Sequence, residues 1–395
     1  MKQYDFDSIV DRHNTDSMKW TVGDGELPMW VADMDFMVAP EIREALQKKL
    51  DHGIFGYSVP SEAWREAYIN WWDRKHHFKM EREWLHFVEG IVPAVASAIR
   101  KFSAPAENVL LMTPVYNHFF YSIEQTGRKI LESPLHYDRG VYSIDWLQLE
   151  QDLAHPKTTL LVLCNPQNPT GNIWSPEDLA HIGELAVRHG VLVLSDEIHC
   201  DVTDPDKTYI PFASVNEQCK NNCVMFVSPT KSFNVAGIKT AAVCVPNPAL
   251  RGRMWASLKS DEIAGVNYFA LQTAITAFNE CENWLDEALK YIYANKQTLS
   301  EYLKMNIPEL KLVHSEATYL QWIDCSNLPG DPSTFSAFLR EKTGLFVSAG
   351  GAYGKVGLNF IRINIACPRR LLSDGLERLK KGVKLYIESV NESRL

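Results

Sequence analysis

The sequence predicts an α/β fold in which helices cover both faces of a mostly parallel sheet, joined to a smaller α+β unit. Three observations support this prediction. From about residue 60 to 280, short apolar runs alternate with segments of helical period, the runs are bounded by Pro, Asp or Asn, and the pattern changes after residue 280. Short bounded apolar runs are typical of strands that are buried on both faces of a sheet.

Five apolar runs are expected to form strands of the large sheet: residues 108–114, 158–166, 190–197, 223–229 and 240–246. Between the second and third run, apolar residues recur at helical spacing. In that helix Ser175 is the expected N-cap, Pro176 the first helical residue and Gly190 the stop signal. Strands that alternate with helices in this way favour parallel pairing.

After residue 280 the pattern indicates a second unit. Residues 282–307 are expected to form one long amphipathic helix, followed by short strands over 317–324 and 359–366 and a closing helix over 371–390. We therefore expect three segments along the chain. They are an N-terminal segment (1–50) that joins the small domain, a large domain (51–284) and a small C-terminal domain (285–395).

Composition excludes several classes of protein. The 395 residues include 40 basic and 49 acidic residues without a basic run, so we do not expect a nucleic-acid partner. The N-terminus lacks the apolar stretch of a signal peptide and no window resembles a membrane helix, which predicts a cytoplasmic protein without membrane association. The eight cysteines lie mostly in apolar runs, and Cys219 and Cys223 lack further ligands, so neither disulfides nor a metal site is expected.

Polar residues with complementary chemistry follow four of the apolar runs. The segments are "TPVYNHF", "NPQNPTG", "SDEIHCD" and "SPTKSF", which contain Tyr116, Asn168, Asp196 and Lys231. Ligands of parallel sheets bind beyond the carboxyl ends of the strands, so these side chains should meet at one edge. An amine, a carboxylate, an aromatic face and phosphate donors are what pyridoxal phosphate requires. Taken singly, each has a plainer interpretation: Lys231 as a solvated charge, Asp196 as a helix cap and Tyr116 as a core residue.

The motifs "SPTKSFNVAGIK", "NPQNPTG" and "SDEIH" resemble those of the fold-type I pyridoxal phosphate enzymes, the aminotransferase class I and II superfamily. Their order and spacing match over almost the entire chain. Within that superfamily "LPMWVADMDF", "GIVPAVASAI", "TPVYNHF", "SDEIHCD" and "RINIACPR" are most similar to the bacterial cystathionine β-lyases of the MalY/PatB type. The resemblance implies the fold-type I fold, with the cofactor bound by the large domain.

The resemblance also implies roles for the residues around the cofactor. Lys231 would bind it as a Schiff base and then act as the base at the substrate Cα. Asp196 would pair with the ring nitrogen, Asn168 would bond the ring hydroxyl oxygen, and Tyr116 would stack on the ring. Phosphate-binding groups are implied at the side chains of Ser228 and Lys239 and at the backbone N–H groups of Ile91 and Val92.

Further implied roles concern the substrate and a second subunit. Arg362 would bind the substrate α-carboxylate, near the backbone of Ala32, because a guanidinium offers two parallel donors. The alternative for Arg362 is a surface charge at a strand edge. Tyr57 would reach the phosphate of the neighbouring subunit, which implies a homodimer. His199 stands where the wider superfamily has tyrosine, and it either tunes the ring oxygen or packs beneath it.

Two other features have plainer interpretations. "GGAYGKVG" (350–357) resembles a dinucleotide-binding loop, but a strand follows it where a helix is required, so we interpret it as a mobile loop near the substrate. His76 and His77 lie in a polar segment and are expected at the surface.

Three functions are compatible with these residues. The lyase signature favours α,β-elimination of L-cystathionine and related S-substituted cysteines to pyruvate, ammonia and a thiol, which is homocysteine for cystathionine. The first alternative is transamination of an α-amino acid on the same apparatus. The second is a protein that binds pyridoxal phosphate and acts as a regulatory interaction partner. Pure binding would need neither the base Lys231 nor the carboxylate clamp Arg362, which counts against this last function.

Overall fold

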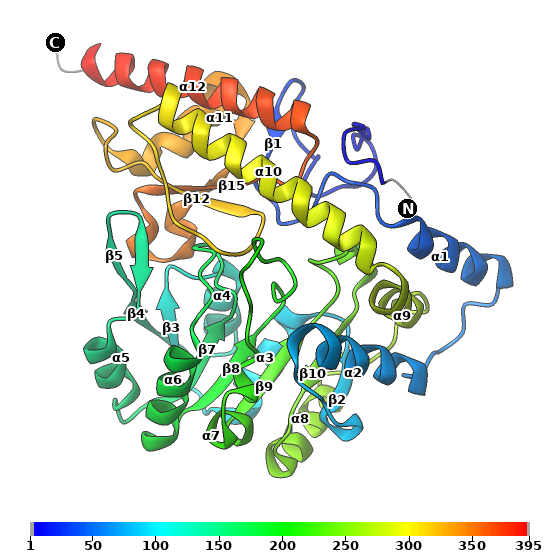
Figure 1. The fold of residues 1–395 in the computed structure, drawn as a ribbon. Helices are drawn as coiled ribbons and strands as arrows, with labels where there is room; N and C mark the ends of the chain where they lie inside the picture. The colour runs from blue at the N-terminus through cyan, green and yellow to red at the C-terminus, as the bar shows by residue number, and fades with distance from the viewer. Residues whose placement is uncertain (1–3, 393–395) are drawn as a thin grey trace.

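The computed structural model describes residues 4–392 and confirms the predicted α/β class (Figure 1). A large sheet with helices on both faces forms the lower part of the molecule in this view, and a smaller sheet with its own helices forms the upper part. The strand order of the large sheet is β2 (Leu85–Val88), β10 (Ala241–Cys244), β9 (Cys223–Val227), β8 (Leu192–Asp196), β7 (Thr158–Cys164), β3 (Asn108–Thr113) and β4 (Lys129–Pro134). Only β10 runs against its neighbours, so the sheet is mostly parallel.

Both faces of the large sheet are buried, which explains why its strands read as continuous apolar runs. In β3, Val109 and Leu111 belong to a core that includes residues of α3 (Ile91–Phe102), whereas Leu110 and Met112 belong to the opposite core with α6 (Pro176–Arg188). The same alternation continues along β7 and β9. Successive side chains of a strand point to opposite faces, so a sheet covered on both sides needs apolar residues at every position.

The helix α6 begins and ends where the sequence predicts. The Ser175 hydroxyl accepts a hydrogen bond from the backbone N–H of Asp178 at 3.0 Å, and the Asp178 carboxylate accepts one from the N–H of Ser175 at 3.2 Å. Gly190 follows the helix in a left-handed conformation with φ of 69°. The other helices around the large sheet are α1 (Pro40–His52), α2 (Glu62–His76), α4 (Asn117–Gln125), α5 (Trp146–Leu153), α7 (Glu217–Asn221), α8 (Pro248–Ser260) and α9 (Ala270–Glu280).

The upper unit is built on a four-stranded antiparallel sheet. Its order is β11 (Lys311–Leu312), β12 (Leu320–Asp324), β15 (Phe360–Asn364) and β14 (Ser348–Ala349), with helices α10 (Glu282–Asn306), α11 (Phe335–Thr343) and α12 (Arg369–Glu392). A short strand near the N-terminus, β1 (Leu27–Pro28), pairs in parallel with β13 (Leu345–Phe346) of this unit. The hairpin β5 (His136–Asp138) and β6 (Val141–Ser143) completes the fold. The expected domain boundary after residue 284 falls in the first turn of α10.

The surface expectation is wrong for His76 and correct for His77. The His76 side chain is only 7% exposed, and its Nε2 lies 2.9 Å from Asp201 Oδ1, because the segment after β8 covers the last turn of α2. His77 is exposed. Cys200 joins these two groups in a cluster of possible metal ligands within 4.8 Å of one another. However, Asp201 already accepts hydrogen bonds from Trp71 Nε1 and Ser232 Oγ, so its oxygens are occupied.

Residues 350–357, expected as a mobile loop, form two short 3₁₀ helices over Gly350–Tyr353 and Lys355–Gly357. A Cβ on Gly350 would lie 2.1 Å from the carbonyl oxygen of Gly357 and 2.4 Å from that of Phe360. The glycines of this segment therefore allow two stretches of backbone to pack closely together. In a dinucleotide-binding loop, the glycines would instead let the backbone approach a phosphate.

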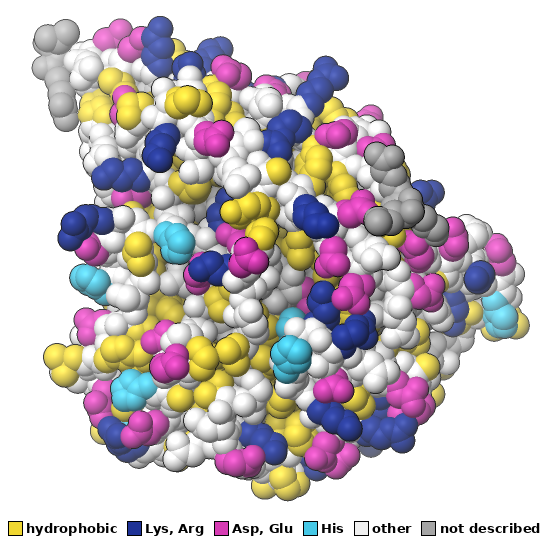
Figure 2. All heavy atoms as spheres, in the orientation of Figure 1, with side chains coloured by type: hydrophobic (Ala, Val, Ile, Leu, Met, Phe, Trp, Pro, Cys, Tyr) yellow, Lys and Arg dark blue, Asp and Glu magenta, His cyan; other side chains and the backbone are white. Residues whose placement is uncertain are grey.

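The surface carries charged side chains of both signs (Figure 2). Basic and acidic side chains are interspersed over the face shown in Figure 2. Within residues 4–392, no helix combines the length and apolar character needed to cross a bilayer. All eight cysteines are buried.

Gly171 closes the turn that carries Asn168 and lies against Glu316 and Ala317. A substitution there therefore tests how much this packing contributes to stability. Gly171 has a φ of 74°, and a Cβ there would lie 2.5 Å from Ser315 Cβ and 2.7 Å from Ala317 O. We expect Gly171→Ala to lower the free energy of unfolding by roughly 2–4 kcal/mol, since backbone strain and steric overlap add. Urea unfolding measures the loss.

Gly127→Ala is the matched control for this substitution. Gly127 has a nearly identical φ of 76°, but nothing lies within 4 Å of the position that a Cβ would occupy there. The control should lose only about 1–2 kcal/mol from backbone strain. Equal losses in the two variants would show that the packing against Ser315 and Ala317 is unimportant.

Candidate active site

The residues expected to carry the chemistry lie at one edge of the large sheet. Tyr116 follows β3, Asn168 follows β7, Asp196 is the last residue of β8 and Lys231 follows β9. These four strands are parallel neighbours, so their carboxyl ends meet at the same edge. The topology therefore brings together segments that are far apart in sequence.

Two adjoining cavities open at this edge. The first, here called the inner cavity, has a volume of about 170 Å³. It is lined by ten of the expected site residues: Ala32, Ile91, Val92, Tyr116, Asn168, Asp196, His199, Ser228, Lys231 and Lys239. The second, the outer cavity, has a volume of about 1020 Å³, is lined by Arg362, and shares Ala32, Tyr116 and Lys231 with the inner cavity. Tyr57 lines neither cavity and is fully exposed.

Lys231 lies where the two cavities meet. Its Nζ donates a hydrogen bond to the backbone oxygen of Ala32 at 2.6 Å. Burial lowers the pKa of Lys231 to about 8; the nearby carboxylates of Asp33 and Asp196 raise the pKa, and the Arg362 guanidinium lowers it. An amine with this pKa is partly neutral near neutral pH, which a nucleophile or a general base requires. The interpretation of Lys231 as an ordinary solvated charge is therefore wrong.

Asp196 is a buried carboxylate with few partners in the protein. It is 4% exposed, and its Oδ1 accepts a hydrogen bond from the backbone N–H of Ile198 at 3.1 Å. Burial raises the pKa of Asp196 to about 7, against the opposing effect of the Lys231 charge. A cation bound beside this carboxyl would lower its pKa again, and the protonated ring nitrogen of pyridoxal phosphate is such a cation.

His199 lines the inner cavity as a neutral ring. It is 2% exposed, and burial, together with the charges of Lys231 and Arg362, lowers its pKa to about 3. Its ring stands edge-on to Tyr319 at 6.3 Å between centroids. Among residues 4–392, its Nδ1 has no hydrogen-bond partner, so it offers a buried polar atom to a bound group.

One end of the inner cavity is suited to an anion. The helix α3 begins at Ile91, and the preceding Gly90 has no side chain that could cap it. The first backbone N–H groups of the helix therefore lie at this end of the cavity without a side-chain acceptor. Lys239 lies here in an exposed, left-handed position with φ of 59°. Ser228 Oγ donates to the carbonyl oxygen of Thr240 at 2.8 Å.

Sequence reasoning missed two threonines at this end. Thr230 and Thr240 both line the inner cavity, and Thr230 Oγ1 lies 2.7 Å from Ser228 Oγ. The buried Thr240 Oγ1 lacks a partner within the described part of the chain. Both belong to the stretch that contains Lys231 and Lys239, so their place in that motif was an available signal.

Arg362 is a buried residue of β15, and the alternative of a surface charge is wrong. It is 4% exposed, with Nη1 donating to Asn168 Oδ1 and Nη2 to the Trp30 carbonyl oxygen, both at 2.9 Å. Its guanidinium lies 4.8 Å from the centroid of the Tyr353 ring. Its Nε is buried and unpaired among the described residues. The fork of Arg362 is thus fixed at the edge of the outer cavity, where a carboxylate can approach it.

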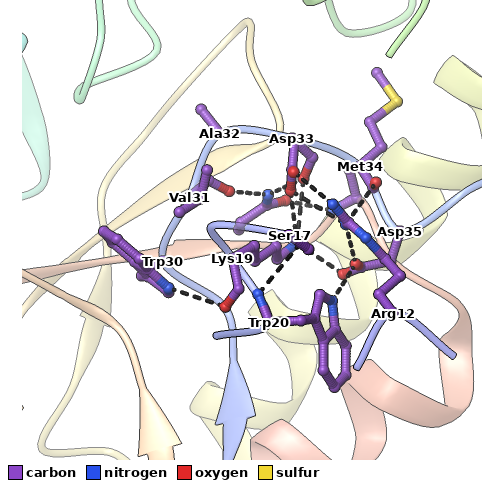
Figure 3. A network of polar contacts seen from close by, with 12 residues as sticks. Arg12, Ser17, Lys19, Trp20, Trp30, Val31, Ala32, Asp33, Met34 and Asp35 are labelled. Atoms are coloured by element: carbon purple, nitrogen blue, oxygen red, sulfur yellow. Dashed lines mark hydrogen bonds and ion pairs between the residues drawn. The ribbon is translucent and has the colours of Figure 1, made fainter. Parts of the chain in front are cut away.

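Residues 30–36 form a strap, and Figure 3 shows the part of it that carries Ala32. The backbone oxygen of Ala32 is the one that accepts the hydrogen bond from Lys231 Nζ. On one side, Arg12 bonds the carboxylates of Asp33 and Asp35 at 2.7 Å each, and the buried Lys19 bonds Asp35 at 2.7 Å. Figure 3 shows these cations between the two acidic side chains of the strap. Buried charges that are paired in this way fix the position of the backbone between them.

Two asparagines hold the other side of the strap. Asn364 Nδ2 donates to the carbonyl oxygens of Val31 and Asp33 at 2.6 Å each. Asn234 accepts from the N–H of Met34 at 2.9 Å and donates back to its carbonyl oxygen at 3.1 Å. Neither asparagine was predicted. Asn364 follows Arg362 by two positions on one strand and so points to the same face, which was a usable signal.

The residues of the inner cavity fit pyridoxal phosphate. Lys231 supplies a partly neutral amine, Asp196 a buried carboxylate in need of a cation, and the start of α3 an anion site. The lining also includes His199, whose buried Nδ1 has no hydrogen-bond partner among the described residues. This donor set matches an aldehyde, a protonated pyridine and a phosphate.

The chain is similar to known proteins over most of its length. The family model for aminotransferase class I and II matches residues 27–379. Cystathionine beta-lyase PatB of Bacillus subtilis is 38% identical over 95% of this chain and 98% of its own length, and protein MalY of Escherichia coli is 31% identical over 96% and 99%. The crystal structure of cystalysin from Treponema denticola, which contains pyridoxal 5'-phosphate, aligns with a TM-score of 0.92 and 34% identity over 97% of this chain and 99% of that one.

The charge balance around Lys231 predicts how its pKa responds to mutation. The Arg362 cation disfavours the Lys231 ammonium, so in the cofactor-free protein Arg362→Gln should raise the pKa of Lys231 above 8. NMR of ¹³C-methylated lysines measures this titration, with Lys231→Ala to identify the signal. Arg188→Gln, which removes an exposed cation from α6, should leave the titration unchanged. A lower pKa in Arg362→Gln would contradict the prediction.

Proposed function

Since the chain belongs to the aminotransferase class I and II family, we propose that it is a pyridoxal-phosphate-dependent carbon–sulfur β-lyase. It converts L-cystathionine and related S-substituted cysteines to pyruvate, ammonia and a thiol. The observation that carries this proposal is the position of Lys231, a partly neutral amine between a cofactor-sized cavity and a larger cavity lined by Arg362. Full-length similarity to cystathionine beta-lyase PatB supports the same reaction.

The cofactor is pyridoxal phosphate, and in our proposal the inner cavity holds it. Lys231 would bind its aldehyde, Asp196 its ring nitrogen and Asn168 its ring hydroxyl oxygen, and Tyr116 would pack against the ring. Ser228, Lys239 and the backbone N–H groups of Ile91 and Val92 would bind the phosphate group. Burial raises the pKa of Tyr116 to about 12, so this side chain stays a neutral phenol.

The residues of the chain prepare the substrate for elimination. When bound, pyridoxal phosphate accepts the electrons released as the substrate Cα loses its proton. Arg362 binds the α-carboxylate through its guanidinium, with Asn168 and the strap at Ala32 beside it, and so orients the Cα–H bond. Once the substrate amine has displaced Lys231 from the cofactor aldehyde, Lys231 Nζ would be free, and it would remove that proton because burial lowers its pKa and leaves it partly neutral. The thiolate then leaves from Cβ into the outer cavity, and the remaining fragment is hydrolysed to pyruvate and ammonia.

The similarity to cystathionine beta-lyase PatB favours elimination over transamination. Both reactions need the same base and the same carboxylate clamp, so Lys231 and Arg362 do not separate them. The outer cavity, with a volume of about 1020 Å³, has room for a sulfur substituent beyond Cβ, as elimination requires. Transamination of an α-amino acid is the alternative, and it would need an oxo acid for repeated turnover.

We propose that the functional unit is a cytoplasmic homodimer. The segment after α1 exposes a group of large apolar side chains, and Figure 1 shows this region projecting from the edge of the molecule. The exposed fractions are 69% for Ile54, 58% for Phe55, 79% for Val59 and complete for Tyr57. A second copy that covers this surface would bury it and bring Tyr57 to the partner's phosphate site. A reducing compartment would keep the eight buried cysteines as thiols.

The proposed reaction predicts turnover without a second substrate. The purified holoenzyme, given L-cystathionine and no oxo acid, should form many equivalents of pyruvate, measured by a coupled assay. Lys231→Ala should abolish formation, by at least about 1000-fold, because both the covalent anchor and the base are lost. Lys304→Ala, which removes an exposed lysine at the end of α10, should retain activity. At most one equivalent of product, with turnover restored by an oxo acid, would instead identify an aminotransferase.

The dimer proposal predicts complementation between two defective subunits. Tyr57→Ala and Lys231→Ala homodimers should each have reduced pyruvate formation. After the two are mixed and allowed to exchange subunits, activity should rise, because one site of the mixed dimer combines Lys231 of one subunit with Tyr57 of the other. Analytical ultracentrifugation checks that the mixture is dimeric. A mixture whose activity equals the mean of the two variants would rule out a shared site.

A further inference from the structure

We propose that Arg340 binds a carboxylate at the far end of the substrate's sulfur substituent. The enzyme then selects S-substituted cysteines that carry a second carboxylate beyond the sulfur. This inference rests on the proposed lyase function and concerns the other end of the same site: the outer cavity is lined by Lys231 and Arg362 at the reaction centre and by Arg340 at its mouth.

A continuous wall connects the two arginines. Arg362 Nη2 bonds the backbone oxygen of Trp30, and the Trp30 ring stacks on Phe346 at 4.8 Å between centroids with an interplanar angle of 21°. The Arg340 guanidinium lies over the Phe346 ring, 3.8 Å from its centroid. All four residues line the outer cavity. A substituent that leaves Cβ can therefore run along an aromatic surface and reach a cation.

The Arg340 guanidinium is held in one orientation. Its Nε donates to Glu26 Oε1 at 2.6 Å and its Nη2 to Glu26 Oε2 at 2.8 Å, while Phe346 supports its face. The pair lowers the pKa of Glu26 to about 2, so this carboxylate stays ionised. Glu26 and Arg340 come from the N-terminal segment and from α11, and they fix each other across the cavity mouth.

One end of the guanidinium remains available. A guanidinium has five N–H donors, and Glu26 takes the side formed by Nε and Nη2. Within residues 4–392, no hydrogen bond involves Nη1, and the side chain is 39% exposed. The Nη1 and Nη2 groups can thus donate two parallel hydrogen bonds to the oxygens of a planar carboxylate.

The mouth of the outer cavity also carries acidic groups. Asp24, which is exposed, and Glu341, whose side chain is 70% exposed, line it beside Arg340. A distal group with both a carboxylate and an ammonium would meet charges of opposite sign there. L-cystathionine carries such a group at the end of its sulfur substituent, whereas S-methyl-L-cysteine does not.

The test compares two substrates that differ only in the distal charge. S-carboxypropyl-L-cysteine has the carboxylate, and its carboxamide has the same shape without the charge. The wild-type holoenzyme should prefer the acid by roughly 10- to 100-fold in kcat/KM, mostly through KM, because a charge-assisted contact is lost in the amide. In Arg340→Gln this preference should fall to within about 3-fold.

Two further variants complete the experiment. Lys342→Gln removes a neighbouring exposed cation of α11 that does not line the cavity, and it should keep the preference. The double variant Glu26→Gln/Arg340→Gln removes the pair together, so an unpaired Glu26 cannot explain the result, and it should lose the preference as well. Equal use of acid and amide by the wild type, or a preference retained in Arg340→Gln, would overturn the assignment.

Failure of the lyase function would look different from failure of this inference. If the wild type forms no pyruvate from any thioether, including S-methyl-L-cysteine, the proposed reaction is wrong. Calorimetric dissociation constants of the acid and the amide then decide the role of Arg340 on their own. If the acid binds more tightly than the amide to the wild type but not to Arg340→Gln, the role of Arg340 is supported. Equal dissociation constants for acid and amide in the wild type refute it.

Discussion

The charges of Lys231, Asp196 and Arg362 are held where most water is excluded, and much of the structure serves to keep them there. Burial lowers the pKa of Lys231 to about 8 and raises that of Asp196 to about 7, so both groups are close to changing protonation state near neutral pH. Isolated charges in such a place would be costly. The nearby carboxylates of Asp33 and Asp196 stabilise the Lys231 ammonium, whereas the Arg362 cation opposes it. The fixed dipoles of Asn168 and the strap also offset part of the cost and leave a site prepared for a charged cofactor.

The strap depends on a second group of buried charges. Lys19 is 1% exposed, and with Arg12 it holds Asp33 and Asp35, which follow Ala32 in the strap. Since Asp33 also raises the pKa of Lys231, the network sets both the geometry and the electrostatics of the amine. A region at the N-terminus, remote in sequence from the central motifs, thereby contributes directly to the chemistry.

The site is assembled from three parts of the chain. The parallel sheet supplies Lys231 and Asp196 at its carboxyl edge, the small antiparallel sheet supplies Arg362, and the N-terminal segment supplies the strap. Hydrogen bonds join these parts: the Gly171 carbonyl oxygen accepts from the backbone N–H groups of Glu316 and Ala317, and Asn168 accepts from Arg362. An enzyme built in this way can vary its substrate by changing the mouth of the outer cavity while the reaction centre stays the same.

The sequence alone determined what depends on neighbours along the chain. Continuous apolar runs indicated strands buried on both faces, the Ser175 cap indicated the start of α6, and the residues after each strand indicated the cofactor edge, because parallel strands end on the same side. Only the tertiary structure decided which distant side chains meet. The burial of His76, the support of the strap by Asn364, and the pairing of Glu26 with Arg340, 314 residues apart, follow from packing. No local pattern encodes such contacts, since they arise only when separate elements fold against one another.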